Sequence, residues 1–391
     1  MPDTEIAYVG SRTSVLRDGR GSGLEVFEIL PDGRWLPRQT VGMDNPSFMV
    51  LSPGGTQLYV AHGDGNQVSA LELDPATGRI DYRDTVDAGG VNPVHLALSP
   101  DRQFLLVANH NSGTVASLRI LPDDSLGPVT GLLSFEGETG PHRRDQNSSK
   151  PHQVVFDATG RYALVPDKGL DSVFTISVDS QGALTWHQDR TVRLREMSGP
   201  RHLVFSPSNR YVYSVEEFLS TVTAYSWDAA TGTLHPIQSL TSLPDTVTGD
   251  SRGAEIAVSP DGTHLYVSNR SGPGDHSPGG DFPDTIGTYD VDPDTGRLGN
   301  GRWTETHGTR PRFFCLDTDG AALLVAHERG HSIAAHALDP ATGTPGPAVF
   351  RAATGSPVAI LRHRIPVPAI TDDSADPSRH RLDAAHRSTT L

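Results

Sequence analysis

The chain has 391 residues, with 32 Lys and Arg against 47 Asp and Glu, and its formal net charge of −15 makes nucleic acid and anionic membrane surfaces poor partners. Apolar residues make up 36% of the chain beside 40 Gly and 30 Pro, a balance typical of many short strands joined by turns. The single cysteine, Cys315, excludes an internal disulfide and a cysteine-based zinc site, and we interpret it as a small buried hydrophobe.

The chain begins with two strand-like segments, residues 6–10 and 24–30, which supply the inner and outer strands of one structural unit. Further along, a turn rich in Ser, Pro, Asp and Gly recurs six times, with starts 47 to 58 residues apart. An apolar run precedes each turn, and an alternating run and a third strand follow it. The six turns lie at residues 52–55, 99–102, 157–160, 206–209, 259–262 and 317–320.

Three or four strands every ~50 residues, without helical periodicity, are typical of β-propeller blades. The six turns and the N-terminal segment predict an all-β fold, a seven-bladed β-propeller that forms a single domain over residues 1–365. We expect the ring to close by pairing N-terminal and C-terminal strands in one blade, which removes exposed sheet edges. The tail, residues 366–391, has little apolar content and is expected to be disordered.

Two insertions interrupt the repeat, at residues 137–150 and 271–284, and both are rich in Gly and in polar residues or Pro. The first leads directly to His152 and the second follows Arg270. Long loops on a compact scaffold are usually functional or mobile, so we expect both insertions to shape a pocket at the mouth of the ring.

Polar residues recur at or just ahead of the predicted inner strands, where side chains from different blades converge on one axis. The residues at these positions are His152, Arg201, Glu255 and Arg312. Glu217 and Arg270 end second strands at the same face. Arginines bind a carboxylate, phosphate or lactone oxyanion bidentately, and His or Glu can move a proton, so this set suits a small anionic ligand.

Each of these residues has a structural alternative, as a solvated side chain or an inter-blade hydrogen bond. We interpret His95 and His202 as structural because they fall inside the apolar pattern. Arg143, Arg144 and Arg310 have no recurring position and are interpreted as surface or loop residues, and Asp167 and Asp171 as the brackets of a tight turn.

Metal-ligand spacing of the His-Xaa-His type is absent, because Lys150 stands where the first histidine would be. The chain contains no phosphate-binding glycine loop and no dinucleotide fingerprint either. We therefore expect no metal and no cofactor. The N-terminus lacks the basic and apolar regions of a signal peptide, and no apolar run approaches the ~18 residues of a membrane span, which predicts a cytoplasmic protein without a membrane partner.

Short phrases in every blade resemble the lactonase family of seven-bladed propellers, over about residues 5 to 362. That family includes the propeller-type 6-phosphogluconolactonase and the carboxy-cis,cis-muconate cyclase. The phrases lie at residues 45–48, 107–109, 112–115, 199–202, 254–256, 259–270 and 311–314.

The resemblance implies a set of catalytic residues, because the muconate cyclase has a His, an Arg, a Glu and a second Arg in its proposed site. The matching positions here are His152, Arg201, Glu217 and Arg270. Glu216 would take the place of Glu217 if the strand register shifted by one residue. Family members often have His where this chain has Lys150 and Tyr where it has His110, and these departures concern the substrate more than the fold. The expected substrate-binding residues are Lys150, Glu255 and Arg312.

The leading hypothesis is a monomeric, metal-independent lactonase of carbohydrate metabolism that acts on a small anionic sugar-acid lactone. Arg201 and Arg270 would hold the anion and the developing oxyanion, and Glu217 or His152 would activate water or protonate the leaving alkoxide. One alternative is an intramolecular lyase (a cycloisomerase) that forms a lactone from a muconate-like dicarboxylate. Another is a propeller that binds a ligand or protein without catalysis.

Overall fold

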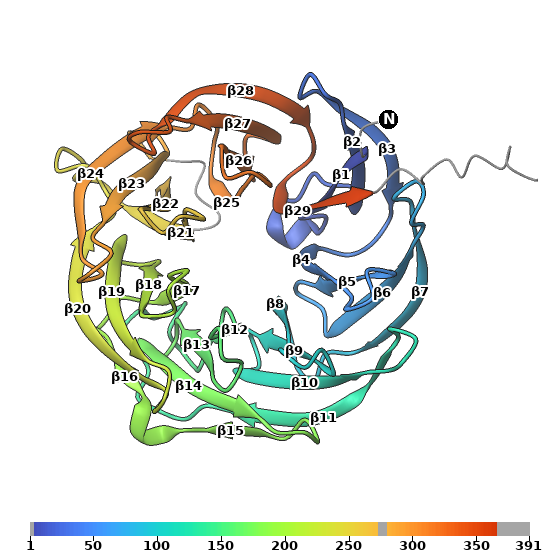
Figure 1. Cartoon of the computed structure of the whole chain (residues 1–391), viewed down its shortest axis with the longest axis horizontal. Helices are drawn as coiled ribbons and strands as arrows, with labels where there is room; N and C mark the ends of the chain where they lie inside the picture. The colour runs from blue at the N-terminus through green and yellow to red at the C-terminus, as the bar shows by residue number, and fades with distance from the viewer. Residues whose placement is uncertain (1–3, 273–279, 366–391) are drawn as a thin grey trace, which may run out of the picture.

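The computed structural model describes residues 4–272 and 280–365. In these residues, recurring polar turns connect apolar strands into seven antiparallel sheets that are arranged in a ring (Figure 1). Within these residues, the helical elements are two 3-10 turns, η1 (Val15–Arg17) and η2 (Gln188–Arg190). No helix in this part of the chain is long and apolar enough to cross a membrane. The predicted seven-bladed, all-β propeller is confirmed.

The blades follow one another around the ring in chain order, and each begins with its innermost strand. The first complete blades are β4 (Pro46–Leu51), β5 (Gln57–His62), β6 (Gln67–Leu73) and β7 (Ile80–Asp87), then β8 (Pro93–Leu98), β9 (Phe104–Asn109), β10 (Thr114–Ile120) and β11 (Leu126–Ser134). Next are β12 (Val155–Phe156), β13 (Ala163–Asp167), β14 (Ser172–Val178) and β15 (Leu184–Trp186), with β16 (Val192–Arg193) paired to β14.

The remaining blades repeat the four-stranded pattern. They are β17 (Pro200–Phe205), β18 (Tyr211–Glu216), β19 (Thr221–Asp228) and β20 (Thr233–Thr241), then β21 (Ser251–Val258), β22 (His264–Ser271), β23 (Thr285–Val291) and β24 (Leu298–Glu305), then β25 (Pro311–Leu316), β26 (Ala322–His327), β27 (Ser332–Leu338) and β28 (Pro345–Ala353).

The last blade joins the two ends of the described chain. Its order is β29 (Pro357–Ile365), β1 (Thr4–Ser11), β2 (Leu24–Ile29) and β3 (Trp35–Val41), with β29 antiparallel to β1. The expected pairing of N-terminal and C-terminal strands is therefore confirmed. The assignment of residues 6–10 to an inner strand was wrong, because β29 takes the inner position and displaces β1 to the second. The expected disorder of residues 366–391 concerns residues outside those described.

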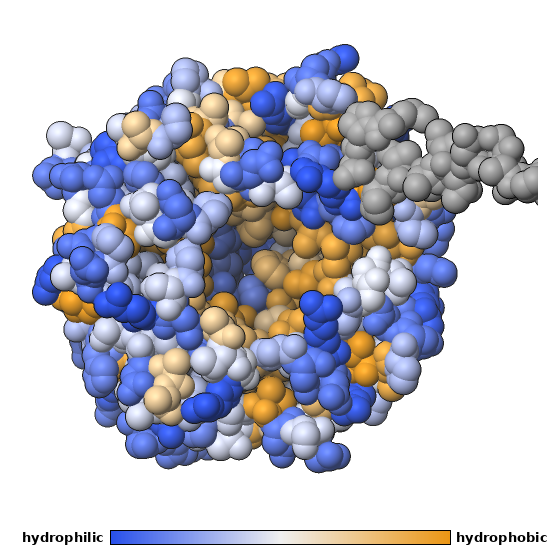
Figure 2. Space-filling view, in the orientation of Figure 1, coloured by the Kyte–Doolittle hydropathy of each residue, from blue (hydrophilic) through white to orange (hydrophobic). Residues whose placement is uncertain are grey.

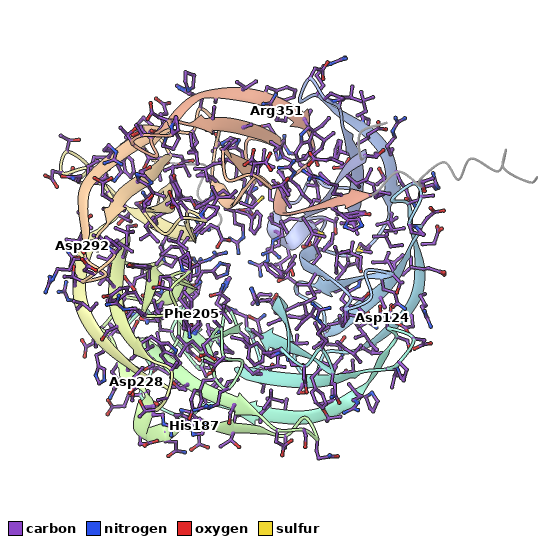
Figure 3. All side chains as sticks on the ribbon, in the orientation of Figure 1. Asp124, His187, Phe205, Asp228, Asp292 and Arg351 are labelled. Carbon is purple, nitrogen blue, oxygen red and sulfur yellow. The ribbon has the colours of Figure 1, made fainter. Side chains whose placement is uncertain are left out.

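The recurring Ser or Asp turn has a direct physical cause. Its side-chain oxygen accepts the backbone N–H of the residue five positions later and so closes the hairpin between the first and second strands of the blade. The oxygen-to-nitrogen distance is 3.1 Å from Ser52 to Gln57 and 2.9 Å from Ser259 to His264. In the outer hairpins, Oδ1 of Asp228 and of Asp292 accepts the N–H two residues later at 2.9 Å in each case, and both residues lie toward the outside of the ring (Figure 3).

The hydrophobic core is divided among the blade interfaces. Residues 4–272 and 280–365 contain seven clusters of buried apolar side chains, and each cluster joins the sheet faces of two neighbouring blades. Tyr266 and Ile286, for example, pack against Phe314 and Leu323 of the next blade. Because every blade is held on both sides, the inner strands form a rigid frame around the axis.

Candidate active site

The inner strands begin with an irregularity that aims side chains at the axis. In β17 the register shifts between Pro200 and His202, so that Arg201 is an extra residue opposite the second strand. The same shift occurs between Pro46 and Phe48 and after Pro311. A β-bulge of this kind redirects the side chain of the inserted residue.

These redirected residues meet in one central cavity. All seven blades contribute to it, since its lining consists of Arg12, Ser47, Phe48, Val94, His152, Arg201, His202, Glu255, Arg312, Phe313 and Val358. Figure 2 shows the ring hollowed at its centre, with hydrophilic residues visible inside the hollow. Four of the residues predicted from sequence, His152, Arg201, Glu255 and Arg312, are thus brought together.

Two histidines and a glutamate form a hydrogen-bonded series inside the cavity. Nδ1 of His202 lies 2.7 Å from Oε1 of Glu255, and Nε2 of His202 lies 3.1 Å from Nδ1 of His152. All three residues are buried. The interpretation of His202 as a structural residue is not supported, because it connects the other two and lines the cavity.

The chemistry of this series fixes where its protons lie. A carboxylate only accepts, so Glu255 takes the N–H of Nδ1 of His202, and Nε2 of a neutral His202 must then accept from Nδ1 of His152. His152 is left with an unprotonated Nε2, which has no hydrogen-bond partner among the described residues. That nitrogen is a proton acceptor in the cavity, and the arrangement is that of an oriented general base.

The surroundings keep His152 neutral. Burial and the nearby Arg201 and His202 lower the pKa of His152 well below its ordinary value. Burial likewise lowers the pKa of His202, although the carboxylate of Glu255 opposes this. Burial, Arg312 and Arg270 also lower the pKa of Arg201, to about 9, so its guanidinium remains positive at neutral pH.

Glu217 lies beside the cavity and is surrounded by cations. Its Oε2 is 2.7 Å from Nζ of Lys168 and 3.4 Å from Nε of Arg201, and its Oε1 is 3.3 Å from Nη2 of Arg270. Arg270 is fully buried, and the other three are nearly so. Lys168 was not predicted as a site residue. It directly follows the second strand of its blade, β13, just as Glu217 directly follows the second strand of the next blade, β18.

The neighbouring acid, Glu216, faces a different environment. Its carboxylate accepts hydrogen bonds from the hydroxyls of Ser214 and Thr221, the latter at 2.8 Å, and it lines a separate pocket with Leu219 and Tyr225. Burial raises the pKa of Glu216 to about 7. In the structure, Glu217 and not Glu216 pairs with Arg201 and Arg270.

Two buried acids position the segments that carry the site. Oδ1 of Asp167 accepts the N–H groups of Lys150 and Gly169 at 2.8 and 2.9 Å, which supports the prediction of a turn at this point. Oδ1 of Asp171 accepts the N–H of Gly199, two residues before Arg201, at 2.7 Å. Lys150 is nearly buried, and the cavity lining does not include it.

The first insertion packs against Phe218, the residue after Glu217. The ring of His142 stacks on Phe218 at 5.1 Å between centroids, and the guanidinium of Arg252 lies 4.7 Å from the centre of the phenyl ring. Nζ of Lys168 lies 5.2 Å from it. Residues 137–150 thus adjoin the site, as expected of a loop that shapes the mouth. The second insertion lies partly outside the described residues.

Arg310 also departs from its predicted place. It is fully buried, and its Nη1 donates to the carbonyl of Ser271 at 3.3 Å. It also has a recurring position, because it precedes Pro311 with a φ of +60°, as Asn45 and Asn92 precede prolines with positive φ in other blades.

Cys315 is half-buried against an inter-blade core, and burial raises the pKa of its thiol to about 12, which agrees with a structural role.

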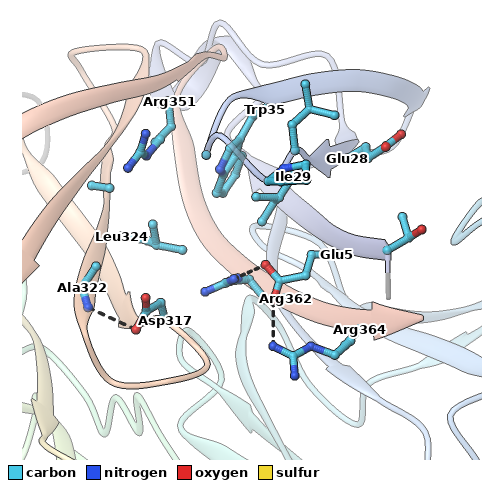
Figure 4. A pocket seen from close by; sticks show the side chains of 15 residues that line it. Glu5, Glu28, Ile29, Trp35, Asp317, Ala322, Leu324, Arg351, Arg362 and Arg364 are labelled. Atoms are coloured by element: carbon cyan, nitrogen blue, oxygen red, sulfur yellow. Dashed lines mark hydrogen bonds and ion pairs between the residues drawn. The ribbon is translucent and has the colours of Figure 1, made fainter. Parts of the chain in front are cut away.

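A wider pocket exists elsewhere, at the seam where β29 and β1 close the ring (Figure 4). Its volume is about 620 Å³, against about 20 Å³ for the central cavity, and Trp35 and Leu324 form part of its wall. Two of its arginines, Arg362 and Arg364, are paired with Glu5, the second at 3.1 Å. This pocket has no histidine in its lining, so the central cavity is the better candidate for proton transfer.

Comparison with known proteins agrees with the fold. A family described as "Lactonase, 7-bladed beta-propeller" matches residues 6–362. The chain is 28% identical to a 6-phosphogluconolactonase of Bacillus subtilis over 86% of this chain and 92% of that protein, and 27% identical to one of Formosa agariphila over 86% and 93%. The solved structure of the periplasmic gluconolactonase of Pseudomonas aeruginosa is 27% identical, covers 93% of this chain and 100% of its own, and superposes with a TM-score of 0.82.

Proposed function

The chain belongs to the lactonase family of seven-bladed β-propellers, and on that basis we propose that it hydrolyses the lactone of a small, negatively charged sugar acid. The relatives named 6-phosphogluconolactonase and gluconolactonase support this reaction class. The observation that carries the mechanism is the series from Glu255 through His202 to His152, which leaves an unprotonated ring nitrogen in a cavity lined by arginines.

His152 acts as the general base in this proposal. Its Nε2 takes a proton from water as the water oxygen attacks the carbonyl carbon of the lactone. The same proton then passes to the ring oxygen as the carbon–oxygen bond of the tetrahedral intermediate breaks, giving a hydroxyl and a carboxylic acid that ionises. Positive charge on His152 is stabilised through His202 by the carboxylate of Glu255. An anionic substrate near Arg201 also raises the basicity of His152, because it offsets the positive field that lowers it.

Arg201 supplies the electrostatic part of the reaction. Its guanidinium is the cation that lines the cavity next to His152, and it stabilises the oxyanion that develops on the carbonyl oxygen. Glu217 is a positioning residue in this proposal, because its carboxylate is shared among Lys168, Arg201 and Arg270 and holds them in place. The sequence left open whether Glu217 or His152 activates water, and in this proposal we assign that role to His152.

The test is a pH-indicator assay of purified protein with a panel of sugar lactones, 6-phosphogluconolactone and gluconolactone included, corrected for spontaneous hydrolysis. We expect His152→Ala and Arg201→Ala to lower kcat/KM by about 100-fold or more. EDTA should leave the wild-type rate unchanged, because we propose that no metal ion takes part.

The matched controls are His235→Ala and Arg161→Ala, which remove exposed side chains of the same types outside the cavity lining. Both should keep wild-type kcat/KM and the same Tm. Wild-type rates in His152→Ala at an unchanged Tm would show that another group is the base. If the wild-type protein accelerates the hydrolysis of none of these lactones, the proposed function is wrong.

Two further properties belong to the proposal. A phosphorylated lactone carries charges that keep it inside a membrane-bounded compartment, so we propose a cytoplasmic role in carbohydrate metabolism, which cell fractionation can check. Ring closure through β29 and β1 leaves no open sheet at the seam, and we propose a monomer. Light scattering at assay concentrations measures this directly.

A further inference from the structure

Arg12 lies in the central cavity and has no role in the reaction as described so far. It follows β1, and its backbone is fixed on both sides, since its N–H donates to the carbonyl of Ser356 at 2.9 Å and its own carbonyl accepts from the N–H of Gly21 at 2.9 Å. Its side chain is directed inward, is 3% exposed as a residue, and lines the cavity together with Arg312.

The guanidinium of Arg12 is not satisfied by the protein. Its Nε and Nη1 are buried without a hydrogen-bond partner among the described residues. The nearest acid is Glu328, whose Oε1 lies 3.9 Å from Nε, beyond hydrogen-bonding distance, and whose Oε2 lies 3.9 Å from Nη1 of Arg312. Oε2 of Glu328 also has no hydrogen-bond partner in the part of the chain that the structure describes. A buried charged donor without a hydrogen-bond partner raises the free energy of the folded protein. A ligand that accepts hydrogen bonds from such donors therefore gains binding free energy.

The distance to its acid distinguishes Arg12 from the cations around Glu217, although Nε of Arg201 also lacks a hydrogen-bond partner among the described residues. Lys168, Arg201 and Arg270 each have an oxygen of Glu217 within 2.7 to 3.4 Å. Arg12 faces its acid at a longer distance and keeps two donors open. Burial, Arg312 and Arg17 lower the pKa of Arg12 to about 10, so the group is still a cation at neutral pH.

The fold makes room for this side chain at Gly63. A Cβ at that position would lie 2.7 Å from Nη1 of Arg12 and 3.0 Å from Cβ of Ser47. Any larger residue there would have to push the guanidinium out of its place. The space for Arg12 therefore depends on a glycine directly after β5, in the blade next to the one that holds β1 (Figure 1).

We propose that Arg12, together with Arg312 and Glu328, forms the subsite that holds a phosphate ester of the substrate. This rests on the proposed lactone hydrolysis and specifies its substrate. In a sugar-acid lactone the carboxyl group is already esterified, so the negative charge that an arginine subsite selects must come from another group. A phosphate oxygen can accept from an open N–H of Arg12, and a hydroxyl of the same ligand can donate to Oε2 of Glu328.

The experiment compares kcat/KM for 6-phosphogluconolactone and gluconolactone in wild type, Arg12→Gln and Arg17→Gln. Arg17 is the matched control, because it is a neighbouring arginine that pairs with Asp64 at 2.9 Å and is absent from the cavity lining. In Arg12→Gln we expect about a 100-fold loss with the phosphorylated lactone and less than a 3-fold change with the other. Arg17→Gln should change both by less than 3-fold.

A second readout does not need turnover. Inorganic phosphate should bind wild type and Arg17→Gln by titration calorimetry and should lose at least ten-fold in affinity in Arg12→Gln. Phosphate binding that depends on Arg12 without lactonase activity would uphold the subsite and overturn the hydrolysis. Equal losses on both lactones, or phosphate affinity unchanged in Arg12→Gln, would overturn the subsite.

If Arg12→Gln does not fold, Arg12→Lys replaces it, because lysine keeps the charge and loses the planar set of guanidinium donors. We then expect at least a ten-fold loss confined to the phosphorylated lactone. The absence of such a selective loss would overturn the proposal.

Discussion

Replacing Glu217 by Gln tests whether this carboxylate holds the cations of the site. At an effective dielectric constant of about 20, opposite charges at the observed 2.7, 3.3 and 3.4 Å attract by roughly 5 to 6 kcal/mol each. Desolvation of all four groups offsets much of this, and removal of one partner from a buried ion pair typically costs about 3 to 5 kcal/mol, because the remaining charges stay buried. We expect Glu217→Gln to lower the free energy of unfolding by that amount.

Equilibrium urea unfolding at pH 7, with reversibility checked, measures this change. The matched control is Glu138→Gln, since Glu138 also pairs with an arginine, Arg193, at 3.1 Å, but its side chain is 84% exposed. An exposed pair contributes about 0 to 1 kcal/mol, so the control should differ little from wild type. A loss below about 1 kcal/mol in Glu217→Gln would refute the reasoning, because it would mean that the three cations are held without this carboxylate.

Three other changes have measurable outcomes. The acid limb of the pH profile of kcat/KM should lie below pH 6.5, because burial lowers the pKa of His152 and keeps it unprotonated there; a limb above pH 6.5 contradicts its assignment as base. Burial raises the pKa of Glu216 from 4.5 to about 7, so the stability that its neutral form contributes is complete below pH 4.5 and is lost as the pH rises through 7. Urea unfolding of Glu216→Gln at pH 8 should therefore give up to about 3 kcal/mol more stability than wild type, and equal values would refute it. Gly199→Ala should lower the Tm by more than about 5 °C in calorimetry, since φ is +60° and the added Cβ would meet the ring of Phe218, whereas an unchanged Tm would mean that the segment before Arg201 adjusts freely.

Most of the fold could be predicted from sequence because each blade is a local unit. The turn that starts at Ser259 closes a hairpin within its own blade, and the same chemistry repeats around the ring. The exception is the seam. Nothing near residues 6–10 indicates that β29, which lies at the far end of the described chain, will take the inner position.

The site was predictable where position alone decides it. Arg201 lies at the start of an inner strand and His152 shortly before one, and residues from all seven blades reach the axis. His202 was missed because strict alternation places it on the face opposite Arg201, toward the blade core. The bulge at Arg201 breaks that alternation and turns both residues to the cavity. Arg12 was missed because β1 had been assigned to the wrong place in its blade.

The late position of β29 in the chain has a consequence for biosynthesis. It is the innermost strand of its blade, yet 346 positions separate the end of β1 at Ser11 from the start of β29 at Pro357. At a translation rate of about 5 to 20 residues per second, the inner edge of β1 stays unpaired for roughly 20 to 70 seconds on the ribosome. During that interval the nascent chain presents a bare strand to any neighbouring nascent chain, which makes this edge the place where non-native strand pairing is most easily formed.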